Sequence, residues 1–201
     1  MDYPMFCYQC EQTAGGKGCT KMGICGKTPE VANLQDLLIY QLKGISCYAE
    51  PLIEKDELID KEVVRFVENS LFTTLTNVNF DVEAHTSLLK ESQQIKERMR
   101  QMAPANIQYP EFATYNLSST KQQMLEDAKR AGIMFDKDLD EDIRSLRQTI
   151  IYGLKGISAY GHQARFLNYW NDQVDQFYFR ALAITTKDDI SVKEMIRWVM
   201  R

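Results

Sequence analysis

Residues 38–49 read LIYQLKGISCYA and residues 150–161 read IIYGLKGISAYG, so one motif occurs twice in the chain. Several identical pairs recur at an offset of 112 residues. They include Leu34 with Leu146, Tyr40 with Tyr152, Leu42 with Leu154, Lys43 with Lys155, Gly44 with Gly156, Ile45 with Ile157, Ser46 with Ser158 and Tyr48 with Tyr160. A repeat of this kind indicates two copies of one supersecondary unit.

The first helix of each copy contains this motif. In the first copy, apolar residues recur with the three-and-four spacing of an amphipathic helix, at Val31, Leu34, Leu38, Leu42, Ile45 and Ala49. Thr28 is a capping residue, and Pro29 suits the first helical position. Pro51 predicts the end of this helix.

Two further helices follow in each copy. At an offset of 111 residues the second helices share Val63 with Val174, Phe66 with Phe177, Leu71 with Leu182 and Thr74 with Thr185. These helices are expected near residues 58–75 and 172–186. The third helix should begin at Asp81 and run to about Met102, and the capping box of Ser191 and Glu194 should open its counterpart. The sequence therefore predicts an all-α fold of two tandem three-helix bundles.

The expected organisation has four parts. A cysteine-rich leader covers residues 1–27, and the first three-helix unit covers 28–102. A linker with a short helix near 120–131 covers 103–140, and the second three-helix unit covers 141–201. The last helix of the second copy has about half the length of its counterpart when the sequence stops. We therefore expect a truncated second unit and a chain cut from a longer protein.

Three residues inside the repeated motif are expected to have structural roles. Gly44 and Gly156 each cost a helix roughly 1 kcal/mol relative to alanine, which favours close helix–helix approach as their explanation. Cys47 has alanine as its counterpart in the second copy, so a small buried side chain is expected there.

Composition excludes several classes of protein. The net charge is −4 and the pI about 5.3, with no basic run, which argues against a nucleic-acid partner. No apolar stretch reaches the eighteen residues of a membrane span, so no membrane partner is expected. The first residues lack the features of a secretory signal. These observations predict a cytoplasmic protein, in which thiols stay reduced.

Four of the five cysteines lie within nineteen residues of the leader, CYQCEQTAGGKGCTKMGIC (7–25). Cys7, Cys10, Cys19 and Cys25 could hold an iron–sulfur cluster, hold a structural zinc ion, or form disulfides. Zinc sites usually contain two Cys-x2-Cys pairs, and only one occurs here. The pattern thus favours a cluster, while zinc and disulfides stay open.

The residues between these cysteines are compatible with a cluster. Five glycines could let backbone N–H groups turn toward sulfur, and they are Gly15, Gly16, Gly18, Gly23 and Gly26. Phe6, Met22 and Ile24 could shield the site from water. Lys17, Lys21 and Lys27 could offset its negative charge, although each alone is expected to be an ordinary solvated residue.

The leader, together with the segments NLQDLL (33–38), TLTNVNFD (74–81) and ITTKDDISVKEMI (184–196), resembles the hybrid-cluster (prismane) protein family of hydroxylamine reductases. The resemblance covers essentially the whole chain. It implies a helical N-terminal domain of two three-helix bundles. It also implies that Cys7, Cys10, Cys19 and Cys25 ligate a [4Fe–4S] cluster, because their short spacing matches that class of the family.

The resemblance further implies a second centre, a hybrid iron–sulfur–oxygen cluster where hydroxylamine is reduced, in later domains that this chain lacks. Neither His85 nor His162 matches a ligand of that centre. His85 is expected to be a hydrogen-bonded structural residue, and His162 to interact with a helix dipole. The expected role is electron transfer from a donor protein toward the hybrid cluster, without turnover by this chain alone. The alternatives are a helical interaction module with a structural metal, or part of a nitric-oxide-detoxifying reductase.

Overall fold

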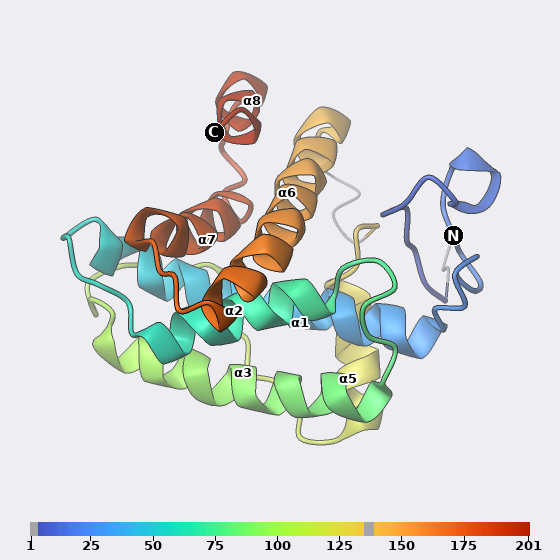
Figure 1. The fold of residues 1–201 in the computed structure, drawn as a ribbon, viewed down its shortest axis with the longest axis horizontal. Coiled ribbons are helices and arrows are strands. Elements are labelled where there is room, and N and C mark those ends of the chain that lie inside the picture. The colour runs from blue at the N-terminus through green and yellow to red at the C-terminus, as the bar shows by residue number, and fades with distance from the viewer. Residues whose placement is uncertain (1–3, 135–138) are drawn as a thin grey trace.

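The structure is a computed structural model, and it describes residues 4–134 and 139–201. As the sequence predicted, the fold is all-α (Figure 1). The helices are α1 (Pro29–Ile53), α2 (Lys61–Thr73), α3 (Val82–Met102), α4 (Glu111–Thr114), α5 (Lys121–Asp127), α6 (Glu141–Phe166), α7 (Asp172–Ile184) and α8 (Val192–Val199), with short 3-10 turns at Ala14–Gly16 and Ala128–Arg130. None of the helices in the described ranges is long and apolar enough to cross a membrane.

The predicted helix starts are confirmed by their caps. The Thr28 hydroxyl accepts a hydrogen bond from the N–H of Val31, and Pro29 is the first residue of α1. Asp81 caps α3 in the same way. Ser191 accepts from the N–H of Glu194 at 3.2 Å and opens α8. These caps satisfy N–H groups that a helix start leaves without an intrahelical partner.

Pro51 does not end α1, so that prediction was wrong. The helix continues to Ile53 although a proline inside a helix removes one backbone hydrogen bond. Leu52 and Ile53 are almost fully buried in the core. Burial of two large apolar side chains contributes several kcal/mol, which offsets that loss.

The glycine prediction holds for one copy only. A Cβ on Gly44 would lie 2.1 Å from the carbonyl oxygen of Phe112, so α4, which the sequence did not predict, approaches α1 closely there. A Cβ on Gly156 would meet no atom of the described residues within 4 Å. Close helix approach therefore explains Gly44 and not Gly156 in this structure.

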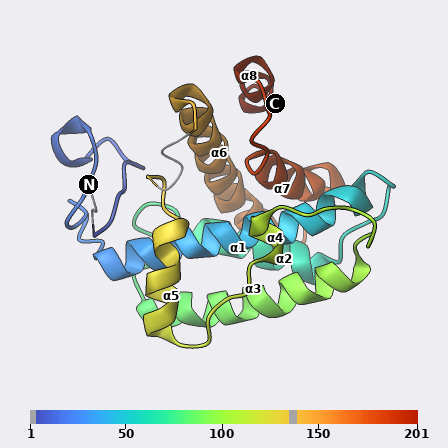
Figure 2. The same ribbon diagram turned by 180° about the vertical axis from the view of Figure 1, so that it is seen from behind.

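The two copies interlock through their second helices. In each copy the third helix packs on the first, as α3 on α1 and α8 on α6. The second helix instead packs mainly on the first helix of the other copy, as α7 on α1 and α2 on α6. Figures 1 and 2 show α3 running alongside α1, with α6 at a steep angle to both. One continuous apolar core results, to which both copies contribute. The division into units at 28–102 and 141–201 stays a prediction.

Candidate metal centre

The leader is folded back on itself around its cysteines. Cys7 and Cys19 form an isolated antiparallel bridge, in which the N–H of Cys7 donates to the carbonyl of Cys19 at 3.1 Å and the N–H of Cys19 donates back at 2.8 Å. The hydroxyl of Thr13 also donates to the carbonyl of Cys7 at 3.1 Å. These bonds bring the first and third cysteines together and place Cys10 on the loop between them.

Glycines permit the turns between the cysteines. Gly15, Gly16 and Gly26 have positive φ angles of 59°, 66° and 89°, which L-residues with side chains rarely adopt. A Cβ on Gly23 would lie 3.0 Å from the sulfur of Cys25. The backbone therefore passes close to this thiol, and a larger residue at position 23 would require the neighbouring atoms to shift.

The Cys19 thiol lies among hydrogen-bond donors. The residue is almost fully buried, and burial opposes ionisation of its thiol. Hydrogen bonds from the N–H groups of Ala14 and Ile24 nevertheless hold its pKa below the ordinary value, and the Thr13 hydroxyl oxygen lies 3.9 Å from its sulfur. Donors of this kind stabilise a thiolate, which is the form that binds metals.

The Cys7 thiol is in a different environment. Burial raises its pKa, and a hydrogen bond from the backbone of Gln9 together with the charge of Lys27 opposes that rise only in part. Cys10 and Cys25 are half-buried at the edge of the leader. The four predicted ligands thus belong to one folded loop, but their surroundings are not equivalent.

The described part of the leader contains no ready-made site for a single metal ion. All five cysteines are free thiols, so no disulfide joins the leader. Within residues 4–134 and 139–201, no three His, Cys, Asp or Glu side chains lie close enough to share one metal ion. In a cubane each cysteine binds a different iron, so its ligands stand farther apart than around zinc. The glycine turns and the donors to sulfur suit such a cluster, and the ligand set itself stays a prediction.

The neighbours of the cysteines differ from the expectations. Lys17 and Lys21 are exposed, as predicted, whereas Lys27 is buried and donates to the Gln35 side-chain oxygen at 2.6 Å. The expectation of a solvated Lys27 was therefore wrong. Met22 and Ile24 are 57% and 63% exposed, so neither shields the thiols in this structure.

Aromatic contacts that the sequence did not reveal fasten the leader to the helical body. The ring of Tyr8 lies edge-on to that of Phe6 at 5.4 Å and to that of Tyr152 on α6 at 5.8 Å. The side chain of Asn33 on α1 donates to the carbonyl of Pro4 at 3.0 Å. Tyr152 belongs to the repeated motif, but its contact with Tyr8 is long-range and has no local sequence signal.

Both histidines have the roles of structural residues. His85 is fully buried, with its Nδ1 2.6 Å from the carbonyl of Asp81 and its Nε2 3.2 Å from the side-chain nitrogen of Gln35. Burial lowers its pKa. His162 lies in the last two turns of α6, where its Nδ1 is 2.8 Å from the side-chain oxygen of Asn69. Neither lies among the cysteines.

Comparison with known proteins finds one matching family and several similar enzymes. Residues 5–201 match the Prismane/CO dehydrogenase family. The chain belongs to that family. It is 40% identical to a hydroxylamine reductase of Syntrophobacter fumaroxidans over 98% of its length and 37% of that protein. It is 39% identical to the enzyme of the same name from Thermosipho melanesiensis, again over 98% of this chain and 37% of the relative. The hydroxylamine reductase of Bacteroides fragilis is 40% identical over 96% of this prismane-family chain, which covers 34% of that relative. The chain therefore spans little more than a third of the length of these relatives.

Proposed function

We propose that this chain is the N-terminal, iron–sulfur domain through which electrons enter a hydroxylamine reductase. The observation that carries the proposal is the folded four-cysteine leader. It occurs in a chain of the Prismane/CO dehydrogenase family, whose similar members are named hydroxylamine reductase. A bound [4Fe–4S] cluster would supply one-electron transfer. Cys7, Cys10, Cys19 and Cys25 would hold it.

The residues around the cysteines would keep such a cluster in place. The N–H groups of Ala14 and Ile24 donate hydrogen bonds to the Cys19 sulfur and favour its thiolate form. The Tyr8–Tyr152 contact fixes the leader against α6. Hydrogen bonds to the ligating sulfurs and the position of the loop are among the factors that set the reduction potential of a bound cluster.

The reaction proposed for the whole protein needs electrons and protons together. Hydroxylamine, two electrons and two protons give ammonia and water. The N–O bond would break at the hybrid cluster in domains beyond these residues, so we expect no turnover by the chain alone. The partners are accordingly an electron-donor protein and the remaining domains. We propose a cytoplasmic location, which agrees with five free thiols.

The experiment is an iron and acid-labile sulfide count on anaerobically prepared protein, with EPR after reduction. We expect about four irons and four sulfides per chain and a reducible centre. Cys19→Ala should lose the cluster. Cys47→Ala is the matched control, because Cys47 is buried away from the leader and bonded to Thr186. Stoichiometric zinc in a colourless protein after iron and sulfide reconstitution would refute the proposal.

A further inference from the structure

A small cavity beside the leader is lined by matching residues of the two copies. Four positions of α1 and the four positions 112 residues later on α6 face it. The pairs are Asp36 with Gln148, Ile39 with Ile151, Tyr40 with Tyr152, and Lys43 with Lys155. We call this space the repeat cavity. The spacing within each set is that of one helix face, so the interlocked copies bring equivalent faces of α1 and α6 together.

The repeat cavity adjoins the predicted cluster site. Gln9, which stands between Cys7 and Cys10, lines it from the leader. Tyr152 lines it from α6 and touches Tyr8 with its ring. The leader thus covers one side of the cavity next to Cys7, and the charges of Asp36 and Lys155 act on the Cys7 thiol.

The two copies differ in charge at one pair only. Asp36 contributes a carboxylate where the second copy has the neutral Gln148, while both copies contribute a lysine. Burial raises the pKa of Asp36 to about 7, and the charges of Lys155, Lys27 and Lys43 oppose that rise. An acid and an ammonium group are therefore placed together beneath the leader.

Lys155 is the lysine of the repeat cavity whose charge acts on Cys7, in addition to the larger effect of Lys27. Its side chain is buried and donates to the carbonyl of Thr74, the residue that ends α2, at 3.3 Å. Burial and the charge of Lys27 lower its pKa to about 7, while Asp36 and Cys7 act in the opposite direction. The carbonyls at a helix end attract a cation, which holds the ammonium at this position.

We propose that Lys155 and Asp36 tune the reduction potential of the cluster bound by the leader, and that their charges shift this potential in opposite directions. An electron added beside Cys7 is stabilised by the ammonium of Lys155 and destabilised by the carboxylate of Asp36. Lys155 is buried and Asp36 is half-buried, so water screens the charge of the ammonium less than that of the carboxylate. The net charge around a cluster is one of the factors that set its potential. This inference rests on the proposed function, since it requires the cluster.

The test is an EPR-monitored redox titration of the anaerobically reconstituted chain and its variants. Lys155→Met removes the cation with little change in length and should lower the midpoint potential. Asp36→Asn removes the anion with its shape kept and should raise it. Lys27, Lys43, Tyr152 and Cys7 stay unchanged and face the pair in every variant.

Lys96→Met is the control, because Lys96 is a buried lysine on α3 that donates to the carbonyl of Tyr115, remote from the leader. It should leave the midpoint potential unchanged. Damage to folding would move both variants in the same direction or remove the cluster, whereas opposite shifts require the charges themselves. Absence of opposite shifts in clusters that form normally would overturn this inference and leave the proposed function standing. Failure of the wild-type chain to bind iron and sulfide would overturn both.

Discussion

Gly44 and Gly156 are equivalent residues of the repeat in different surroundings. At Gly44 an added Cβ would collide with the backbone of α4, and at Gly156 it would enter open space. Neither glycine has a positive φ. The cost of a glycine inside a helix is therefore compensated by packing in the first copy only.

This difference predicts opposite effects of one substitution. Gly44→Ala should destabilise the chain by roughly 1–3 kcal/mol, because α4 must move. Gly156→Ala should stabilise it by about 0.5–1 kcal/mol, because alanine loses less backbone entropy in a helix. Urea unfolding followed by circular dichroism measures both. A Gly44→Ala chain as stable as the wild type would show that α4 does not pack as described.

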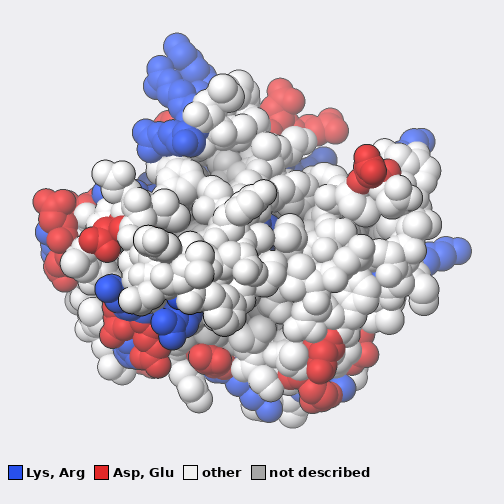
Figure 3. Space-filling model, in the orientation of Figure 1, with Lys and Arg blue, Asp and Glu red and all other residues white. Residues whose placement is uncertain are grey.

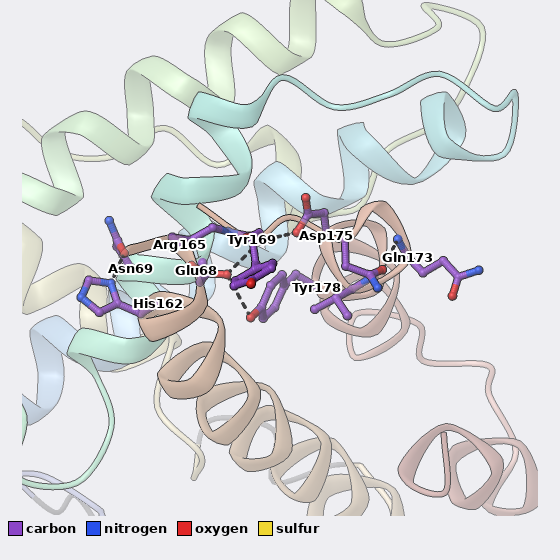
Figure 4. Close-up of polar contacts among 10 residues, drawn as sticks. Glu68, Asn69, His162, Arg165, Tyr169, Gln173, Asp175 and Tyr178 are labelled. Carbon is purple, nitrogen blue, oxygen red and sulfur yellow. Dashed lines mark hydrogen bonds and ion pairs between the residues drawn. The ribbon is translucent and has the colours of Figure 1, made fainter. Parts of the chain in front are cut away.

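At the scale of the elements, α2, α6 and α7 meet at a buried ionic cluster (Figure 4). Arg165 of α6 binds Glu68 of α2 at 3.1 Å and also pairs with Asp175 of α7. The hydroxyl of Tyr178 donates to the Glu68 carboxylate at 3.3 Å. A Cβ on Gly161 would lie 2.4 Å from that carboxylate, so only glycine leaves room for it. The cluster joins helices of both copies.

Glu68 gives this junction a pH dependence. Burial raises its pKa, with Arg165 opposing that rise, so the folded state holds the proton more firmly than the unfolded state does. Its contribution to stability is present below its ordinary pKa of 4.5 and is lost as the pH rises through the raised value. Glu68→Gln should therefore flatten the fall in the free energy of unfolding above about pH 4.5. The free energy of unfolding of this variant should still fall somewhat with rising pH, since burial also raises the pKa of Asp175.

Glu97→Gln is the matched control for this prediction. Glu97 is exposed, and its hydrogen bond with Arg100 lowers its pKa. The contribution of Glu97 to stability is present above its ordinary pKa and is lost as the pH falls. Glu97→Gln should therefore change the free energy of unfolding at acidic pH and leave the fall above pH 4.5 unchanged. The measurement is the free energy of unfolding of the wild type and both variants, from urea titrations at several pH values. Equal slopes for the wild type and Glu68→Gln between pH 4.5 and neutrality would contradict the prediction.

The sequence predicted where the helices begin better than it predicted which helices pack together. Caps such as Thr28 and Ser191 act within one turn, so a single stretch of sequence reveals them. The position of Gly44 against α4 and the burial of Lys27 depend on residues that are distant in sequence. The interlocking of α2 and α7 is also long-range, because periodicity shows which face is apolar but not which helix covers it.

The candidate site shows the same limit. The four cysteines and the leader glycines are visible in the sequence, because their residue types and spacing carry the chemistry. The donors to Cys19 depend on how the loop folds. The placement of Asp36 and Lys155 around one cavity depends on two residues more than a hundred positions apart in the sequence.

At the scale of the whole molecule, an apolar surface lies along α6 and just beyond it. Its most exposed members are Tyr160, Phe166, Leu167 and Tyr169, each at least 69% exposed. Figure 3 shows few charged side chains over the centre of the face that it draws. Because the relatives extend well beyond the matched part, we propose that the remaining domains of the full-length protein cover this surface.

Tyr160→Asp tests this arrangement. In the 201-residue chain it should change the free energy of unfolding by less than about 0.5 kcal/mol, since the side chain is 83% exposed. In the full-length protein it should lower the melting temperature clearly, because a charge would be buried against the neighbouring domains. Lys90→Asp, an exposed change on α3, should be silent in both. An equal melting temperature for wild-type and Tyr160→Asp full-length proteins would exclude this face as the contact.

The interlocked helices also determine when the chain can finish folding during synthesis. The thiol of Cys47 on α1 meets the hydroxyl of Thr186, 139 residues later, and Glu50 pairs with Lys187 across a similar separation. A ribosome needs on the order of ten seconds to add that much chain. Throughout that interval α1 has been made, but the apolar side that α7 will cover has no partner. The first copy must therefore wait for the second, and this interval is when the nascent protein is most exposed to misassembly.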